Sequence, residues 1–288
     1  MIWFLYALLS AATNAAYLTV SKKMVSISSR YWAAATVSAM AAIFAGIALA
    51  SRGIPALGPG FWPAFLTEAV LEALGMILVF KALEKTDVSL AAPIMALTPV
   101  FLLITSPLMT GEIPSTLGTF GVLLAVLGMY LLSYKGGQKS VWAPFSNLWY
   151  NEGTRLMLLV AALYSITANS YKLAVVNSSP EFTQTTLSAV LAIEIGLLAI
   201  LKKEKLPSAR KGFLKIAGLD GLLIALSGLL LGYALSAGLT PYVISIRRLS
   251  VPAAVVFGHV FLGERNLGQR LFASLISFIG VVLMLWAG

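Results

Sequence analysis

Charged side chains inside long apolar runs are the residues of this sequence best suited to chemistry. Arg247 and Arg248 interrupt one such run, and two adjacent guanidiniums offer forked donors that match carboxylate or phosphate oxygens. They predict a clamp for an anionic ligand, with a structural ion pair to an acidic residue as the alternative. Four acidic residues lie in other apolar runs: Glu68, Glu72, Glu194 and Asp220. A carboxyl group so placed either exchanges protons or pairs with a cation, and both roles stay open.

Polar residues at helical spacing form a second candidate group. Ser165, Asn169 and Lys172 share one face of a helix and suit the wall of a binding cavity. Hydrogen bonding between helices is the alternative for Asn169, and snorkelling to the nearest water is the alternative for Lys172. Asn14 holds the corresponding position near the N-terminus. Tyr233 is a candidate hydrogen-bond donor to a substrate, or an aromatic anchor at a membrane surface.

The sequence lacks the residues of common catalytic and metal sites. It has no cysteine and one histidine, so we predict no metal ion and no thiol chemistry. His259 follows Arg248 by eleven residues and is either an interfacial residue or a proton relay. The common hydrolase and nucleotide-binding motifs are absent as well. We therefore predict neither an enzyme nor a cofactor, and assign no catalytic residue.

The composition indicates helices that cross a membrane. Hydrophobic residues make up 59% of the 288-residue chain and charged residues 11%, against about 25% charged in soluble domains. A membrane-spanning helix needs about 20 apolar residues. Ten runs approach that length: 2–21, 31–51, 61–81, 88–109, 115–134, 155–175, 182–201, 213–236, 240–262 and 267–287. The net charge of +9 sits mostly between these runs, so we expect lipid headgroups as its partner and no nucleic acid.

The chain divides into two related halves around a polar stretch at 135–154. Polar residues match when the sequence is shifted by 152 residues, or by 155 at the first helix: Gly111-Glu112 with Gly263-Glu264, Glu68 with Asp220, Ser10 with Ser165, and Asn14 with Asn169. We predict five helices in 1–134 and five in 155–288. Because five is odd, the second half enters the membrane from the opposite side. Such inverted repeats are typical of secondary transporters.

These features resemble the EamA family of the drug/metabolite transporter superfamily. The Gly-Glu pairs open the last helix of each half, before GTFGVLLAVLGMYLL and RLFASLISFIGVVLMLW, and the resemblance covers the whole chain. It implies ten membrane helices and transport of a small molecule. Sugar-phosphate translocators of this superfamily bind phosphate with a Lys-Arg pair in the ninth helix, which Arg247 and Arg248 match. The equivalent positions in the first half are Met95 and Ala96, so the charges occur in one half only.

We therefore predict a secondary active transporter that moves a small carboxylate- or phosphate-bearing metabolite by alternating access. One alternative is a proton-coupled exporter of cationic or amphipathic drugs or amino acids, and another is a lipid flippase. Protons are a candidate coupling ion. We expect a multi-pass protein of the inner or plasma membrane, as a monomer or homodimer. Sixteen of the twenty Lys and Arg residues lie near the loops opposite the termini, which predicts termini outside the cytoplasm, although family members usually have both inside.

Overall fold

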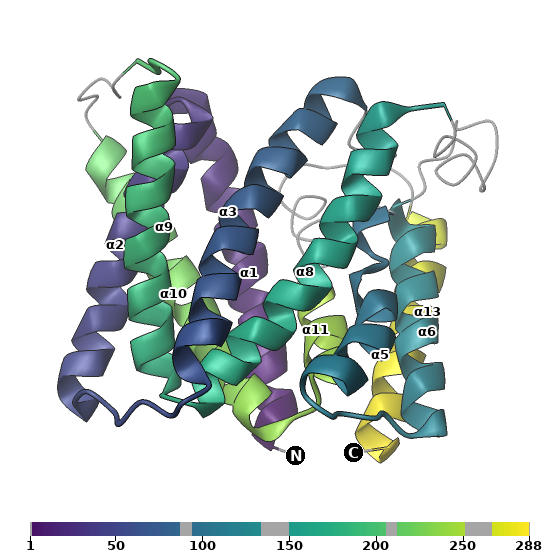
Figure 1. Ribbon diagram of the computed structural model, residues 1–288. Coiled ribbons are helices and arrows are strands. Elements are labelled where there is room, and N and C mark those ends of the chain that lie inside the picture. Colours follow the sequence, from purple (N-terminus) through teal and green to yellow (C-terminus); the bar gives the residue numbers. More distant parts are fainter. Residues whose placement is uncertain (1, 87–93, 134–149, 206–211, 251–266, 288) are drawn as a thin grey trace. The chain divides into compact units, whose positions relative to one another are not determined.

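The computed structural model describes residues 2–86, 94–133, 150–205, 212–250 and 267–287 (Figure 1). Their regular secondary structure is α-helical. The chain forms two compact units. The first unit consists of residues 70–170 and 238–288, and the second unit of Ile2–Ala69 and Tyr171–Ala237. Each unit therefore draws on both the N-terminal and the C-terminal part of the sequence.

The second unit is built on helices that pack side by side. They are α1 (Ile2–Ile27), α2 (Arg30–Arg52), α9 (Pro180–Leu201) and α10 (Phe213–Ala237). Helix α10 contacts each of the other three, and α2 runs along α9 (Figure 1). Local sequence sets where these helices begin. The hydroxyls of Ser29 and Ser179 accept hydrogen bonds from backbone N–H groups in the first turns of α2 and α9, as N-caps do.

The first unit contains the remaining helices. They are most of α3 (Phe61–Lys85) and of α8 (Glu152–Val176), with α5 (Thr98–Met109), α6 (Thr116–Ser133), α11 (Thr240–Arg248) and α13 (Leu267–Ala287). Helices α6 and α13 lie against each other along their lengths (Figure 1). Buried Ala82, Ile94, Met157 and Val160 form an apolar cluster that packs α3 against α8.

Helix boundaries differ from the predicted runs at three places. Helix α1 continues to Ile27, through Lys22 and Lys23, because lysine is a good helix former and does not end a helix. The predicted helices 88–109 and 240–262 contain turns at Leu97 and Leu249 instead of running on smoothly. Proline follows each turn within a few residues, and proline removes a backbone donor and restricts the residue before it. Residues 87–93 and 251–266 lie outside the described part of these runs.

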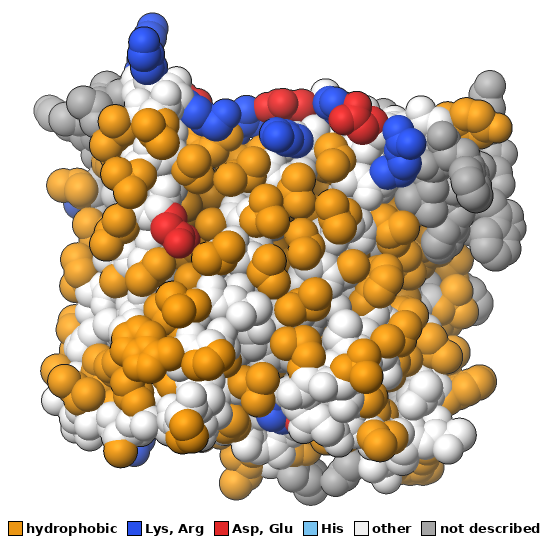
Figure 2. Space-filling model, in the orientation of Figure 1, with side chains coloured by type: hydrophobic (Ala, Val, Ile, Leu, Met, Phe, Trp, Pro, Cys, Tyr) orange, Lys and Arg blue, Asp and Glu red, His pale blue; other side chains and the backbone are white. Residues whose placement is uncertain are grey.

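Six of the described helices are long and apolar enough to cross a membrane: α1 over Ile2–Ser21, α2, α3 over Phe61–Ala82, α8, α9 and α10. Shorter apolar helices lie at Thr98–Met109, Thr116–Leu131 and Leu275–Ala287. Hydrophobic side chains cover most of the face drawn in Figure 2. A surface of this kind suits contact with lipid rather than water.

Candidate functional site

Two interrupted helices of the first unit meet at their interruptions. Helix α5 begins at Thr98, just after the turn at Leu97, and α11 ends at Arg248, just before the turn at Leu249. The Nη2 atom of Arg248 donates a hydrogen bond of 3.1 Å to the hydroxyl of Thr98, which is fully buried. The Thr98 hydroxyl in turn donates to the carbonyl of Met95 at 2.9 Å. This chain of bonds holds a guanidinium at the N-terminal end of α5.

The described part of the site contains two guanidiniums and one carboxylate. The carboxylate of Glu72, on α3, interacts electrostatically with the guanidiniums of both Arg247 and Arg248. The N-terminal end of a helix adds a partial positive charge of about half a unit. Two guanidiniums and the start of α5 thus face one carboxylate. Within the described residues, Thr98 accepts a hydrogen bond from Arg248, whose guanidinium carries five N–H donors in all.

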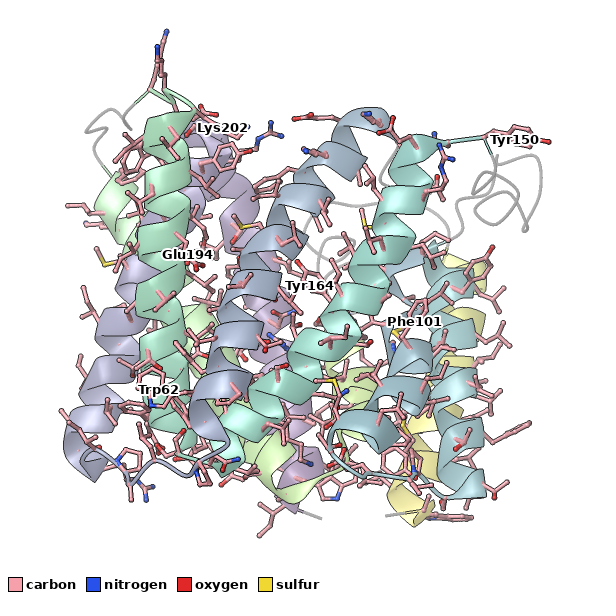
Figure 3. All side chains as sticks on the ribbon, in the orientation of Figure 1. Trp62, Phe101, Tyr150, Tyr164, Glu194 and Lys202 are labelled. Carbon is pink, nitrogen blue, oxygen red and sulfur yellow. The ribbon has the colours of Figure 1, made fainter. Side chains whose placement is uncertain are left out.

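A glycine brings α3 close to α8 beside this site. A Cβ atom at Gly75 would lie 2.6 Å from Cε1 of Tyr164, so a larger residue there would clash with the ring. Figure 3 shows Tyr164 between the two helices. Glu72 lies three residues before Gly75 and so on the same face of α3. Tyr164 interacts electrostatically with Arg248, which makes α8 a fourth contributor to the site.

Asn169 is bound to other side chains in the first unit. Its Nδ2 donates to the hydroxyl of Thr105 at 3.0 Å and to the carbonyl of Ser165 at 3.0 Å. Its Oδ1 accepts from the hydroxyl of Ser106 at 2.8 Å. The side chain therefore joins α8 to α5. This arrangement is the interhelical hydrogen bonding that the sequence left open as the alternative to substrate binding.

Tyr233 has a partner in the second unit. Its hydroxyl donates a short hydrogen bond to the carboxylate of Glu181 at the start of α9, and its ring stacks on Tyr6 with centroids 5.3 Å apart. The Nε of Arg52 lies 3.8 Å from the same carboxylate, although the Arg52 side chain is 72% exposed. The candidate substrate donor is thus held in a cluster of Tyr233, Glu181 and Arg52.

Most of the remaining candidates belong to the second unit. Asp220, fully buried on α10, accepts hydrogen bonds from Ser21 of α1. Glu68 is buried in the part of α3 that belongs to the second unit. Asn14 and Lys172, also of the second unit, are half-buried. His259 falls outside the described residues.

Glu194 occupies an unusual position on α9. Hydrophobic side chains surround an acidic side chain on the face drawn in Figure 2, at the place where Figure 3 labels Glu194. Its neighbours Ile193 and Leu197 are 63% and 54% exposed. Among the described residues, the buried Oε2 atom of Glu194 meets no hydrogen-bond partner.

The N-terminal half of the chain matches a known family model. Residues 1–134 match the model of the EamA-like transporter family, which confirms the resemblance seen in the sequence. EamA-like proteins are membrane transporters of the drug/metabolite transporter superfamily rather than enzymes. The chain is accordingly a multi-pass membrane transporter.

Solved structures share the fold of this chain. Among them is a crystal structure of a protein that is 15% identical to it, with a TM-score of 0.76 over 99% of this chain and 96% of the other. At that identity the likeness concerns the fold alone. None of the curated proteins matches the sequence.

Sequence reasoning missed several residues that take part in these clusters. Three of them carry no charge: Thr98, Tyr164 and Ser21. The fourth, Glu181, lies in the first turn of α9. None of the four therefore stands out as a charge inside an apolar run. One signal was present for Thr98: it directly precedes Pro99 and follows a Leu that matches Leu249 under the 152-residue shift.

Proposed function

We propose that this protein is a secondary active transporter for a small metabolite that bears a carboxylate or phosphate group. The observation that carries the proposal is the grouping of two guanidiniums with one carboxylate in the described part of the first unit. Arg247, Arg248 and the start of α5 place positive charge around one carboxylate, Glu72. Buried charge of one sign needs a counter-charge, and an anionic substrate supplies it.

The position of the arginines at interrupted helices supports transport in particular. Transporters often bind substrate where membrane helices are discontinuous, because the free helix ends supply charge and can move. Arg248 bridges the interruption in α11 to the one next to Thr98 in α5. Movement of these helix ends would raise or lower the affinity for an anion bound between them.

The pairing of helices supports an inverted five-plus-five repeat. In the proposed repeat, α2 of the first half corresponds to α9 of the second half, and α6 corresponds to α13. Helix α2 packs against α9, and α6 packs against α13. Likewise, α1 corresponds to α8 and α10 corresponds to α3. The packing of α1 on α10 therefore has its counterpart in the packing of α8 on α3, and each packing occurs within one unit. The turns at Leu97 and Leu249 are 152 residues apart, which equals the shift that aligns the halves. Alternating access by such a repeat, in the inner or plasma membrane, is part of the proposal.

Binding measurements on arginine variants test the anionic substrate. Glycerol 3-phosphate and succinate serve as phosphate and carboxylate probes, because a bound ligand raises thermal stability by mass action. Arg248→Lys keeps the charge but loses the fork. A charge-assisted hydrogen bond contributes about 1.5–3 kcal/mol, so the affinity for the better probe should fall about 10- to 100-fold. Arg247→Lys should weaken binding as well.

The control is Arg52→Lys, the same change at an arginine that is 72% exposed, and it should leave probe affinity unaltered. If Arg247→Lys and Arg248→Lys both keep full affinity, or lose it only in step with thermal stability, the arginines are structural. Tetraphenylphosphonium as a third probe tests the cationic alternative. Stabilisation by this cation and by neither anion would replace the proposal with a drug exporter.

A further inference from the structure

A buried carboxyl group on α10 meets one hydroxyl group from α1. The Oγ atom of Ser21 lies 3.0 Å from Oδ1 and 2.8 Å from Oδ2 of Asp220. A serine hydroxyl has a single hydrogen to donate. If the carboxyl group is protonated, one of its oxygens accepts that hydrogen and the other donates its own to Oγ. Protonation therefore turns both short distances into well-directed hydrogen bonds.

No cation offsets a charge on Asp220 among the described residues. Helix α10 packs against α1, α2 and α9. The charged and titratable residues of these four helices, besides Asp220, are Tyr6, Tyr17, Lys22, Lys23, Arg30, Tyr31, Arg52, Glu181, Glu194, Lys215 and Tyr233, of which the side chain of Lys22 lies outside the described part. In the described part of the chain, Ser21 is the hydrogen-bond partner of Asp220, and the carboxyl makes no ion pair. An ionised carboxylate without a counter-charge in such surroundings takes up a proton instead.

Apolar side chains pack between the Ser21–Asp220 pair and the nearer ends of α1 and α10. Asp220 lies seven residues after Phe213, where α10 begins, and Ser21 six residues before Ile27, where α1 ends. At 1.5 Å per residue both positions are about 10 Å deep. An apolar cluster packs α1, α2 and α10 together on the way, and its buried members are Met24, Ala33, Val37, Phe213 and Ala217.

The residue after Asp220 packs closely against α2. A Cβ atom at Gly221, the residue after Asp220, would lie 2.3 Å from Cβ of Met40 on α2. The two helices therefore leave no room for a side chain at position 221. Asp220 itself is 0% exposed. Ser21, by contrast, keeps part of its surface exposed.

We propose that the Ser21–Asp220 pair is the proton-binding site that couples this transporter to a proton gradient. The inference rests on the proposed secondary transport and names its coupling site. In the packed state the carboxyl group holds the proton, and Ser21 positions it by donating to one oxygen and accepting from the other. When α10 separates from its neighbours, water solvates the group, which releases H⁺ and becomes a carboxylate. Glu72, by contrast, interacts electrostatically with the two arginines of the first unit.

Infrared difference spectroscopy of the reconstituted protein tests the protonation directly, without a substrate. The wild-type protein at neutral pH should show the C=O stretching band of a protonated carboxylic acid, and Asp220→Asn should remove it. The asparagine amide can still accept from and donate to Ser21, so thermal stability should be retained. Ser21→Ala keeps the carboxyl group but removes a hydrogen-bond partner, so the band should move to higher frequency. Glu194→Gln, a change at the other acid of these helices without a charged partner, should leave the band in place.

Transport in liposomes provides the second measurement. Asp220→Asn should abolish accumulation of the anion probe driven by a pH gradient, while equilibrium binding of that probe persists. Absence of an Asp220-dependent band, a band unmoved by Ser21→Ala, or full gradient-driven transport by Asp220→Asn would each overturn the proposal. Failure of both anion probes to bind the wild-type protein would instead refute the anionic substrate, and the infrared result would still decide the proton site.

Discussion

Replacing Asn169 with alanine removes the side chain that ties α8 to α5. Two of its three hydrogen bonds cross between the helices, to Thr105 and from Ser106, and the third reaches the backbone of its own helix. Hydrogen bonds between membrane helices average about 0.6 kcal/mol and reach about 1.7. Loss of two should lower the free energy of unfolding by about 1–3 kcal/mol. The affinity for anion probes should change little, because the arginines stay in place.

Unfolding in mixed micelles, titrated with sodium dodecyl sulfate, measures the effect. A double-mutant cycle of Asn169→Ala with Ser106→Ala isolates their interaction, and we expect a coupling energy of about 0.5–2 kcal/mol. Thr67→Ala is the control. The Thr67 hydroxyl is exposed and donates to the carbonyl of Pro63 in its own helix, so its loss should stay within about 0.5 kcal/mol.

Two results would refute this reasoning about Asn169. Strictly additive effects in the cycle would mean that the hydrogen bond to Ser106 adds nothing to stability. Unchanged stability with a tenfold or greater loss of probe affinity would restore Asn169 as a substrate ligand. The latter outcome would favour the cavity-wall hypothesis that its helical spacing first suggested.

Further changes test packing and a buried hydrogen bond. Gly280→Ala places a Cβ atom 2.5 Å from a backbone oxygen of α6. The clash should lower the free energy of unfolding by about 1–3 kcal/mol. Gly218→Ala, whose Cβ atom would meet nothing within 4 Å, is the control and should be tolerated in the same unfolding assay. Tyr233→Phe removes the donor to the buried Glu181 carboxylate and should cost about 1–3 kcal/mol in unfolding titrations. Arg52→Ala, on the same carboxylate but 72% exposed, should cost less than about 1 kcal/mol; an equal loss from both would contradict the assignment.

Local sequence was sufficient for the positions of most helices and for the family resemblance of residues 1–134. Apolar runs of about 20 residues mark membrane helices because the thickness of the hydrocarbon layer sets their length. Ser179 and Pro180 mark the start of α9 because a cap acts within one turn of its own chain. The family resemblance read from the Gly-Glu pairs agrees with the match over residues 1–134. The ten spans and the repeat stay predictions.

Tertiary structure decided which partner each candidate side chain meets. Arg248 reaches Thr98, 150 residues away, and Tyr233 reaches Glu181, 52 residues away. The sequence placed four acids in apolar runs but gave no means to separate Glu72, which lies near two guanidiniums, from Asp220, which meets only a serine hydroxyl among the described residues. The distinction depends on how each helix is rotated and which helix packs beside it. Those are properties of the assembled bundle, because periodicity along one helix shows which residues share a face but not what that face contacts.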